Sequence, residues 1–75
     1  MTASILLIED ESSIADNVIY SLKAEGFVVY WQTEGERGLA VMHEKAIDLV
    51  ILDVGLPDLS GFEVCKRIRK TSDVI

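Results

Sequence analysis

Three carboxylates stand where two apolar segments of the sequence end. Asp53 follows the apolar run 49–52 (LVIL). Glu9 and Asp10 follow the run 4–8 (SILLI). An unpaired charge inside an apolar segment is costly, so Asp53 is expected at the rim of the core, paired or beside a cation. Carboxylates with a backbone carbonyl and water form the hard oxygen site that suits Mg²⁺, so these residue types predict a divalent-cation site.

The elements that must position these acids alternate along the chain. Runs 4–8, 27–31 and 49–52 are apolar, β-branched or aromatic, which is typical of buried strands. Between the first two runs, apolar residues recur at helical spacing: Ile14, Ala15, Val18, Ile19 and Leu22. Residues 73–75 (DVI) have the composition of the start of a fourth strand.

Local signals predict where the helices begin and end. Gly26 is expected to stop the first helix. Thr33 with Glu36, and Ser60 with Glu63, have the spacing of capping boxes that open the second and third helices. The expected buried residues of these two helices are Leu39, Ala40 and Met42 in the second, and Val64, Cys65 and Ile68 in the third.

This alternation predicts a parallel sheet with right-handed crossovers and helices on both faces. In such sheets, functional groups gather at the carboxyl ends of the strands, where the strand order reverses. If strands 4–8 and 49–52 are neighbours, Glu9, Asp10 and Asp53 converge. At about 4 Å and an effective dielectric constant near 20, each like-charged pair costs roughly 4 kcal/mol. Protons or a cation must then neutralise the cluster.

The composition limits which classes of protein the chain can belong to. The chain has 75 residues, 49% hydrophobic and 27% charged, which fits one small globular domain. A net charge of −6 argues against nonspecific nucleic-acid binding, and the basic run 66–70 (KRIRK) reads as a solvated helix end. Cys65, the single cysteine, suits a reducing compartment. Without an apolar stretch near the length of a membrane span or a signal-peptide pattern, a cytoplasmic location is expected.

The motifs LLIEDE and VILDVGLPDLSG, at this spacing and in this strand–helix order, resemble the receiver domain of two-component response regulators of the OmpR/PhoB type. The resemblance covers every residue of the chain. It implies an α/β fold, the flavodoxin-like (CheY-like) doubly wound parallel sheet. Residues 1–75 are then expected to be the N-terminal part of a receiver domain, ending at the start of the fourth strand, with no effector domain present. The intact parent would control transcription through a C-terminal DNA-binding domain.

The resemblance also implies residue roles. Asp53 would accept a phosphoryl group from a sensor histidine kinase in a Mg²⁺-dependent reaction, in which Mn²⁺ can substitute. Asp10 would be a direct metal ligand, Glu9 would act through water, and Gly55 would supply its backbone carbonyl. The protein would be no enzyme beyond its own phosphorylation and autodephosphorylation at Asp53.

Two further residues match the loop that shapes the acceptor's surroundings. Pro57 would fix its φ angle, and Gly61 would tolerate unusual backbone angles beside the third helix. Asp58, between them, is explained by turn chemistry alone. His43, which has no second His or Cys spaced for a metal, is expected at the surface.

The departure from the family pattern leaves an alternative open. The family places a Thr or Ser after the fourth strand and a Lys after the fifth. Thr71, Ser72, Lys66 and Lys70 stand in the wrong elements for these roles. A truncated, switching-impaired interaction module is therefore the second hypothesis. Strand 49–52 would then have an open edge, through which the chain could self-associate.

Two enzyme classes are alternatives to this assignment. A Rossmann nucleotide binder requires G-x-G-x-x-G after the first strand, where this chain has EDESS. A phosphatase of the haloacid-dehalogenase type usually carries a second Asp two residues after its nucleophile, and that position is Gly55. Neither class fits the residues present.

Overall fold

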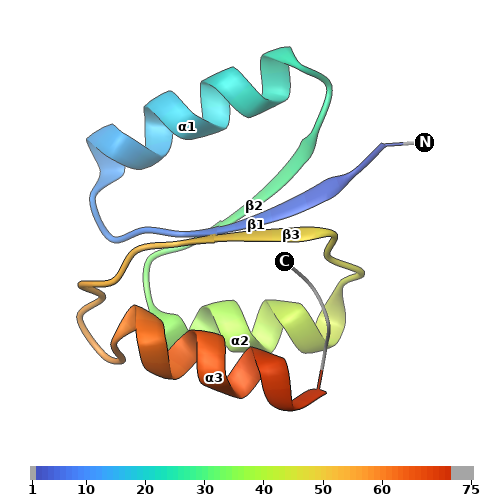
Figure 1. Ribbon diagram of the computed structural model, residues 1–75. Coiled ribbons are helices and arrows are strands. Elements are labelled where there is room, and N and C mark those ends of the chain that lie inside the picture. The colour runs from blue at the N-terminus through green and yellow to red at the C-terminus, as the bar shows by residue number, and fades with distance from the viewer. Residues whose placement is uncertain (1, 72–75) are drawn as a thin grey trace.

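A computed structural model describes residues 2–71 of the protein. Its elements, coloured along the chain in Figure 1, are β1 (Ser4–Ile8), α1 (Ser12–Ala24), β2 (Val28–Gln32), α2 (Gly35–Glu44), β3 (Leu49–Leu52) and α3 (Gly61–Thr71). The predicted alternation of strands and helices is confirmed, with the second strand beginning one residue later than expected. The expected fourth strand at 73–75 lies outside the described residues.

The three strands form a parallel sheet in the order β2-β1-β3. In the register, Leu6 stands between Tyr30 of β2 and Val50 of β3. Figure 1 shows α1 on one face of the sheet and α2 with α3 on the other. The sequence predicted that the acids converge if the first and third strands are neighbours. In the structure β1 and β3 are neighbours, so their carboxyl ends lie together.

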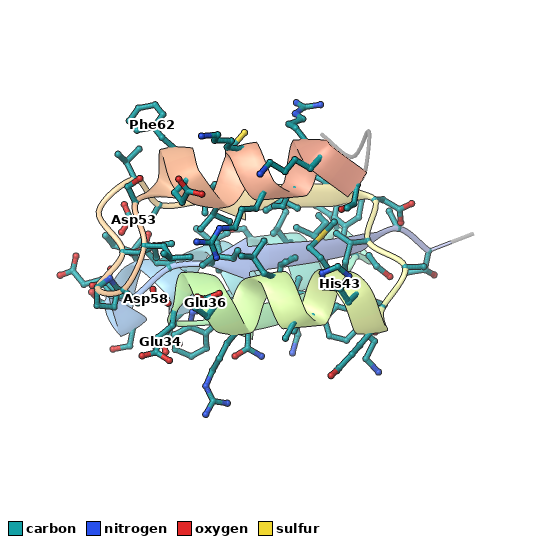
Figure 2. The ribbon with its side chains drawn as sticks, turned by 90° about the horizontal axis from the view of Figure 1, so that it is seen from below. Glu34, Glu36, His43, Asp53, Asp58 and Phe62 are labelled. Atoms are coloured by element: carbon teal, nitrogen blue, oxygen red, sulfur yellow. The ribbon has the colours of Figure 1, made fainter. Side chains whose placement is uncertain are left out.

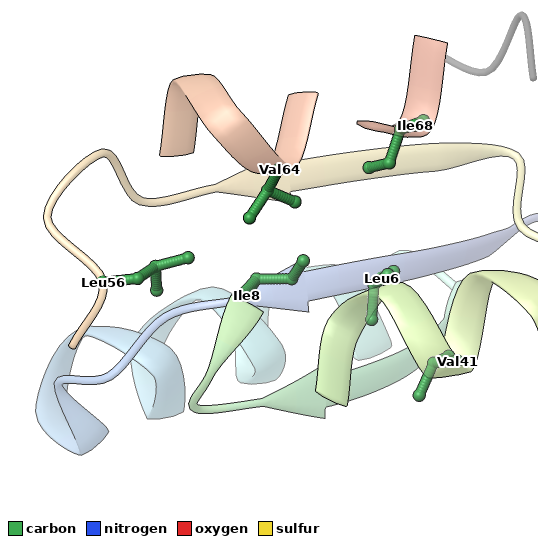
Figure 3. Close-up of a cluster of buried hydrophobic side chains, with 6 residues drawn as sticks. All are labelled: Leu6, Ile8, Val41, Leu56, Val64 and Ile68. Carbon is green, nitrogen blue, oxygen red and sulfur yellow. The ribbon is translucent and has the colours of Figure 1, made fainter. Parts of the chain in front are cut away.

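The core is centred on β1, whose residues Ile5 to Ile8 are all buried. Side chains alternate along a strand, so Leu6 and Ile8 point to the face covered by α2 and α3. Figure 3 shows the cluster that forms there: Leu6, Ile8, Val41, Leu56, Val64 and Ile68. The strand that precedes the acidic pair is thus central in the described sheet and the most deeply buried of its strands.

Two residues expected in the core, Ala40 and Cys65, are exposed. On α2 the buried residues are Gly35, Gly38 and Val41. A Cβ atom on Gly38 would overlap the Ile8 side chain, so the glycine face of α2 approaches the sheet and Ala40 turns outward. Cys65 follows buried Val64 directly, and one residue corresponds to a rotation of about 100° around a helix. The prediction that these two side chains are buried was wrong.

The first helix ends as Gly26 predicts. Gly26 has a φ of 90°, its N–H donates to the Lys23 oxygen (2.9 Å), and the N–H of Phe27 donates to the Leu22 oxygen (3.1 Å). These are the two hydrogen bonds of a Schellman motif. The third helix is capped by Ser60, whose Oγ accepts the Glu63 N–H at 3.1 Å.

The predicted capping box at Thr33 is wrong. The residue before α2 is Glu34, and it makes no side-chain cap hydrogen bond. The N-terminus of α2 is capped by a residue from a distant loop, described below with the site.

Candidate metal centre

The carboxyl ends of β1 and β3 are held together by the backbone beyond the strands themselves. The N–H of Asp53 donates to the Ile8 oxygen at 2.9 Å. On the other side of β1, the N–H of Glu9 donates to the Gln32 oxygen at 3.0 Å. Glu9 and Asp53 are therefore placed by the hydrogen-bond pattern of the parallel sheet rather than by flexible loops.

The three predicted carboxylates meet at this end of the sheet. One oxygen from each of Glu9, Asp10 and Asp53 lies within 4.8 Å of the others. Asp10 is exposed, and the other two residues are partly buried. The donors are all hard oxygens, and they can surround one divalent cation of the Mg²⁺ type. The residues present therefore fit such an ion.

Within the cluster, the Glu9 carboxyl has a raised pKa. Partial burial raises the pKa of its carboxyl above the usual 4.5, and the charges of Asp53 and Asp10 raise this pKa further. The N–H of Glu11, which donates to Glu9 Oε2 at 3.2 Å, acts in the opposite direction. A site that favours a proton at one acid also favours a cation beside it.

Gly55 lies next to the acid that closes β3. Its N–H donates to Asp53 Oδ1 at 3.2 Å, which limits the rotation of that carboxylate. Gly55 itself is exposed, and a Cβ atom added there would meet nothing within 4 Å. The role of its carbonyl as a metal ligand stays a prediction.

Gly61 shapes the loop for a reason other than the expected one. Within residues 2–71, a positive φ occurs at Gly26 and not at Gly61. A Cβ atom on Gly61 would lie 2.6 Å from the backbone carbonyl oxygen of Asp53 and 2.8 Å from Val54 Cα. The glycine is required because the start of α3 packs against the backbone that carries Asp53. Pro57 lies exposed in the same loop, after buried Leu56.

Asp58 has a structural role, the capping of α2, that the sequence did not indicate. Its Oδ1 accepts the Gly35 N–H at 2.7 Å, and its Oδ2 accepts the Glu36 N–H at 2.9 Å. These two bonds lower the pKa of the Asp58 carboxyl below its usual 3.8. Asp58 therefore caps α2 from a loop more than twenty residues away, and no local pattern could have indicated it. Figure 2 shows Asp53 and Asp58 at the same end of the molecule.

The structure also places Trp31 and His43. The indole N–H of Trp31 donates to the Glu9 carbonyl oxygen at 2.8 Å, a contact that the sequence did not predict. His43 is exposed, as expected, and lies toward the opposite end of α2 in Figure 2.

Across the part of the chain that the structure describes, no helix has both the length and the apolar character needed to cross a bilayer.

Comparisons with known proteins agree with this geometry. The family model of the response regulator receiver domain matches residues 5–75. The transcriptional regulatory protein AfsQ1 of Streptomyces coelicolor is 45% identical over 71 residues, which are 95% of this chain and 32% of that protein. The transcriptional regulatory protein CreB of Escherichia coli is 47% identical over 68 residues, 87% of this chain and 28% of that protein. The chain thus spans about a third of the length of these relatives.

Solved structures share the fold. The response regulator TrrA of Thermotoga maritima, in complex with Mg²⁺ and BeF, superposes with a TM-score of 0.91 at 35% identity, covering 95% of this chain and 62% of that one. A complex of the histidine kinase ThkA with TrrA gives a TM-score of 0.91 at 35% identity, covering 97% and 64%. The chemotaxis regulator CheY4 of Vibrio cholerae gives 0.92 at 31% identity, covering 95% and 59%. The chain belongs to the receiver domain family of two-component response regulators.

Proposed function

We propose that this chain is the phosphoacceptor part of a two-component signalling protein, with Asp53 as the residue that is phosphorylated. The observation that carries the proposal is the convergence of Glu9, Asp10 and Asp53 within 4.8 Å at the carboxyl ends of two neighbouring strands. A phosphoryl group carries negative charge, so a purely acidic site can accept it only together with a cation. The donor set present supports that combination.

The chain's own residues have distinct parts in this proposal. An oxygen of the Asp53 carboxylate attacks the phosphorus of a phosphohistidine, and an O–P bond forms as the P–N bond breaks. The electron pair of that bond leaves with the imidazole of the donor, which takes up a proton. The Gly55 N–H, bonded to Asp53 Oδ1, holds the carboxylate in a defined orientation during the attack. In the later hydrolysis, water attacks the phosphorus, the O–P bond to Asp53 breaks, and inorganic phosphate leaves while Asp53 returns to its carboxylate form.

The cation is proposed to bind between the acids. Asp10 and Asp53 would coordinate it directly, Gly55 would add its carbonyl oxygen, and Glu9 would contact it through water. When bound, Mg²⁺ neutralises charge on the transferring phosphoryl group, and Mn²⁺ can take its place. Asp10 is the most exposed of the three acids.

The partner of this site is proposed to be a sensor histidine kinase. Support comes from the similar regulator TrrA, whose structure with the kinase ThkA is known. We further propose that residues 1–75 belong to the N-terminal part of a receiver domain in a cytoplasmic transcription regulator, since the matched relatives AfsQ1 and CreB are transcriptional regulatory proteins of about three times this length.

Acetyl phosphate with Mg²⁺ tests the proposal directly. The intact mass of the protein should increase by one phosphoryl group, the increase should require the metal, and digestion should place the group on Asp53. An Asp16→Asn protein provides a carboxylate-to-amide exchange at an exposed position of α1, outside the acceptor site, and it should still be labelled. A protein that binds Mg²⁺ but gains no mass would instead support the alternative, a switching-impaired interaction module.

A further inference from the structure

The loop between β3 and α3 is anchored at three places. At its start, the Asp53 N–H donates a hydrogen bond to Ile8 of β1, and the Asp53 backbone lies against Gly61. In its middle, Leu56 is only 8% exposed and belongs to the buried cluster of Figure 3. The third anchor is the Asp58 carboxylate. Because Pro57 fixes φ between the last two anchors, the segment 56–58 has little conformational freedom.

The Asp58 anchor is a charge-assisted one. The first N–H groups of a helix have no partner within the helix, and the helix dipole places partial positive charge on them. Two of these groups, on Gly35 and Glu36, donate to the two oxygens of Asp58 at 2.7 and 2.9 Å. The side chain of Glu34, the residue before α2, provides no cap hydrogen bond. The start of α2 thus depends on Asp58 for its capping.

The N-terminal end of α2 also packs against α3 and the loop before it. Gly35 is buried, and a Cβ atom there would lie 2.8 Å from Val64 Cγ2 and 3.1 Å from Leu59 Cβ. The Arg67 guanidinium joins Glu36 of α2 at 3.3 Å with Glu63 of α3 at 3.0 Å. The body to which Asp58 ties the loop is therefore itself fixed to α3.

Gly55 is the residue that these anchors hold in place. It is exposed, without neighbours that would contact a side chain, so its position is set by what flanks it. On one side it is bonded to Asp53. On the other side, Leu56 and Asp58 hold the chain. Releasing Asp58 would let the loop relax away from α2 and carry the Gly55 carbonyl with it.

We propose that Asp58 is a positioning residue of the metal and phosphoacceptor site, which ties the loop after Asp53 to the N-terminus of α2 and so fixes the Gly55 carbonyl. This inference rests on the proposed function, because it assigns a task to Gly55 that matters only when a cation binds. It predicts that loss of Asp58 weakens the metal site even in molecules that remain folded.

The test compares Asp58→Ala and Asp58→Asn with the wild-type protein. Mg²⁺ is titrated with Trp31 fluorescence and with the amide shifts of Gly35, Glu36 and Gly55 as readouts. We expect Asp58→Ala to bind Mg²⁺ about 10-fold more weakly, the usual loss when a partner beyond the metal ligands is removed. Asp58→Asn keeps one carbonyl acceptor for an α2 N–H, so its loss should be smaller. Asp16→Ala, which removes an exposed carboxylate from α1, is the matched control for charge and should bind as wild type does.

Phosphorylation by acetyl phosphate gives a second readout. The labelling rate of Asp58→Ala should fall at low Mg²⁺ and return to that of the wild type at saturating Mg²⁺, because the nucleophile itself is intact. Because bound Mg²⁺ also stabilises a folded protein, the folded fraction is measured from the amide spectrum at each concentration and the rate is expressed per folded molecule. A loss of stability alone would leave that corrected rate equal to the wild-type rate at both concentrations. If Asp58→Ala folds too poorly to measure, the comparison of Asp58→Asn with wild type decides in the same way.

Two results would overturn the inference, and they can be told apart. If the Gly35 and Glu36 amides of the variant show that the cap is lost while the Mg²⁺ affinity of the folded protein is unchanged, Asp58 is a helix cap and nothing more. If the wild-type protein itself binds no Mg²⁺, the proposed metal site fails, and the positioning role fails with it.

Discussion

The indole nitrogen of Trp31 donates a hydrogen bond of 2.8 Å to the carbonyl oxygen of Glu9. This bond joins the end of β2 to the residue that begins the acidic cluster. A shift of the Glu9 backbone would change the surroundings of the only tryptophan in the sequence. We therefore expect Trp31 fluorescence to respond to metal binding, which allows the first prediction to be tested without a label.

Asp10→Asn should weaken Mg²⁺ binding by more than about 10-fold, since even residues that act on a metal indirectly commonly contribute that much. The variant removes one of three converging charges while keeping the size of the side chain. A Mg²⁺ titration of Trp31 fluorescence measures the change, with Asp16→Asn as the control for net charge. Equal affinities of Asp10→Asn and the wild-type protein would remove Asp10 from the site.

Asp53→Asn should abolish phosphorylation by acetyl phosphate, because an amide lacks the carboxylate needed to attack phosphorus. Its stability without metal should equal or slightly exceed that of wild type, since one source of repulsion near Glu9 is removed. Intact-mass spectrometry and thermal unfolding measure the two effects. Wild-type labelling of this variant would show that the phosphoryl group goes elsewhere.

The metal-free protein should lose stability as the pH rises from about 4.5, because of Glu9. Its pKa in the folded state is raised above the usual 4.5, so the native state holds this proton at pH values where the unfolded chain has released it. The free energy of unfolding then falls as the pH rises through the interval between the two pKa values. Urea denaturation in a chelator at several pH values measures the slope.

Two comparisons make this pH dependence specific. Glu9→Gln has no proton to release at position 9, so its stability should vary less across the same interval. Asp58 acts in the opposite direction: its lowered pKa contributes stability that is present above pH 3.8 and is lost on further acidification. A Glu9→Gln protein with the same slope as wild type would contradict the assignment to Glu9.

Gly61→Ala should destabilise the protein by about 1–3 kcal/mol, the usual cost of inserting an atom into a filled space. The new methyl group would meet backbone atoms of Asp53 and Val54 at 2.6 and 2.8 Å, and backbone cannot rotate away as a side chain can. The matched control for stability is Gly55→Ala, where nothing lies within 4 Å. Similar urea midpoints for the two variants would show that the start of α3 can move.

The 75-residue chain is predicted to self-associate or exchange strands through β3. This strand forms one edge of the described sheet, and its residues Leu49 to Leu52 are apolar and only partly buried. An apolar parallel edge with free backbone groups is a template for pairing. Sedimentation equilibrium and amide exchange test the prediction. A monodisperse monomer with strongly protected β3 amides would refute it.

The sequence alone determined the elements and the place where the acids meet. Short continuous apolar runs are typical of strands in a parallel sheet, and the helical spacing of Ile14 to Leu22 indicates a helix between the first two runs. Gly26 and Ser60 act locally, through bonds to residues a few positions away, so their roles could be read from spacing. The convergence of Glu9 and Asp53 follows once β1 and β3 are neighbours.

Only the tertiary structure decided how the helices face the sheet and how the acceptor loop is held. Cys65 and Ala40 were placed in the core because they are small and apolar, but the faces that pack were set by Gly35, Gly38 and Val64, through contacts between elements. Gly61 is needed for a close backbone approach that its own dihedral angles do not show. Asp58 caps a helix that begins 23 residues earlier in the chain, and such a partner is found only when folding brings the two segments together.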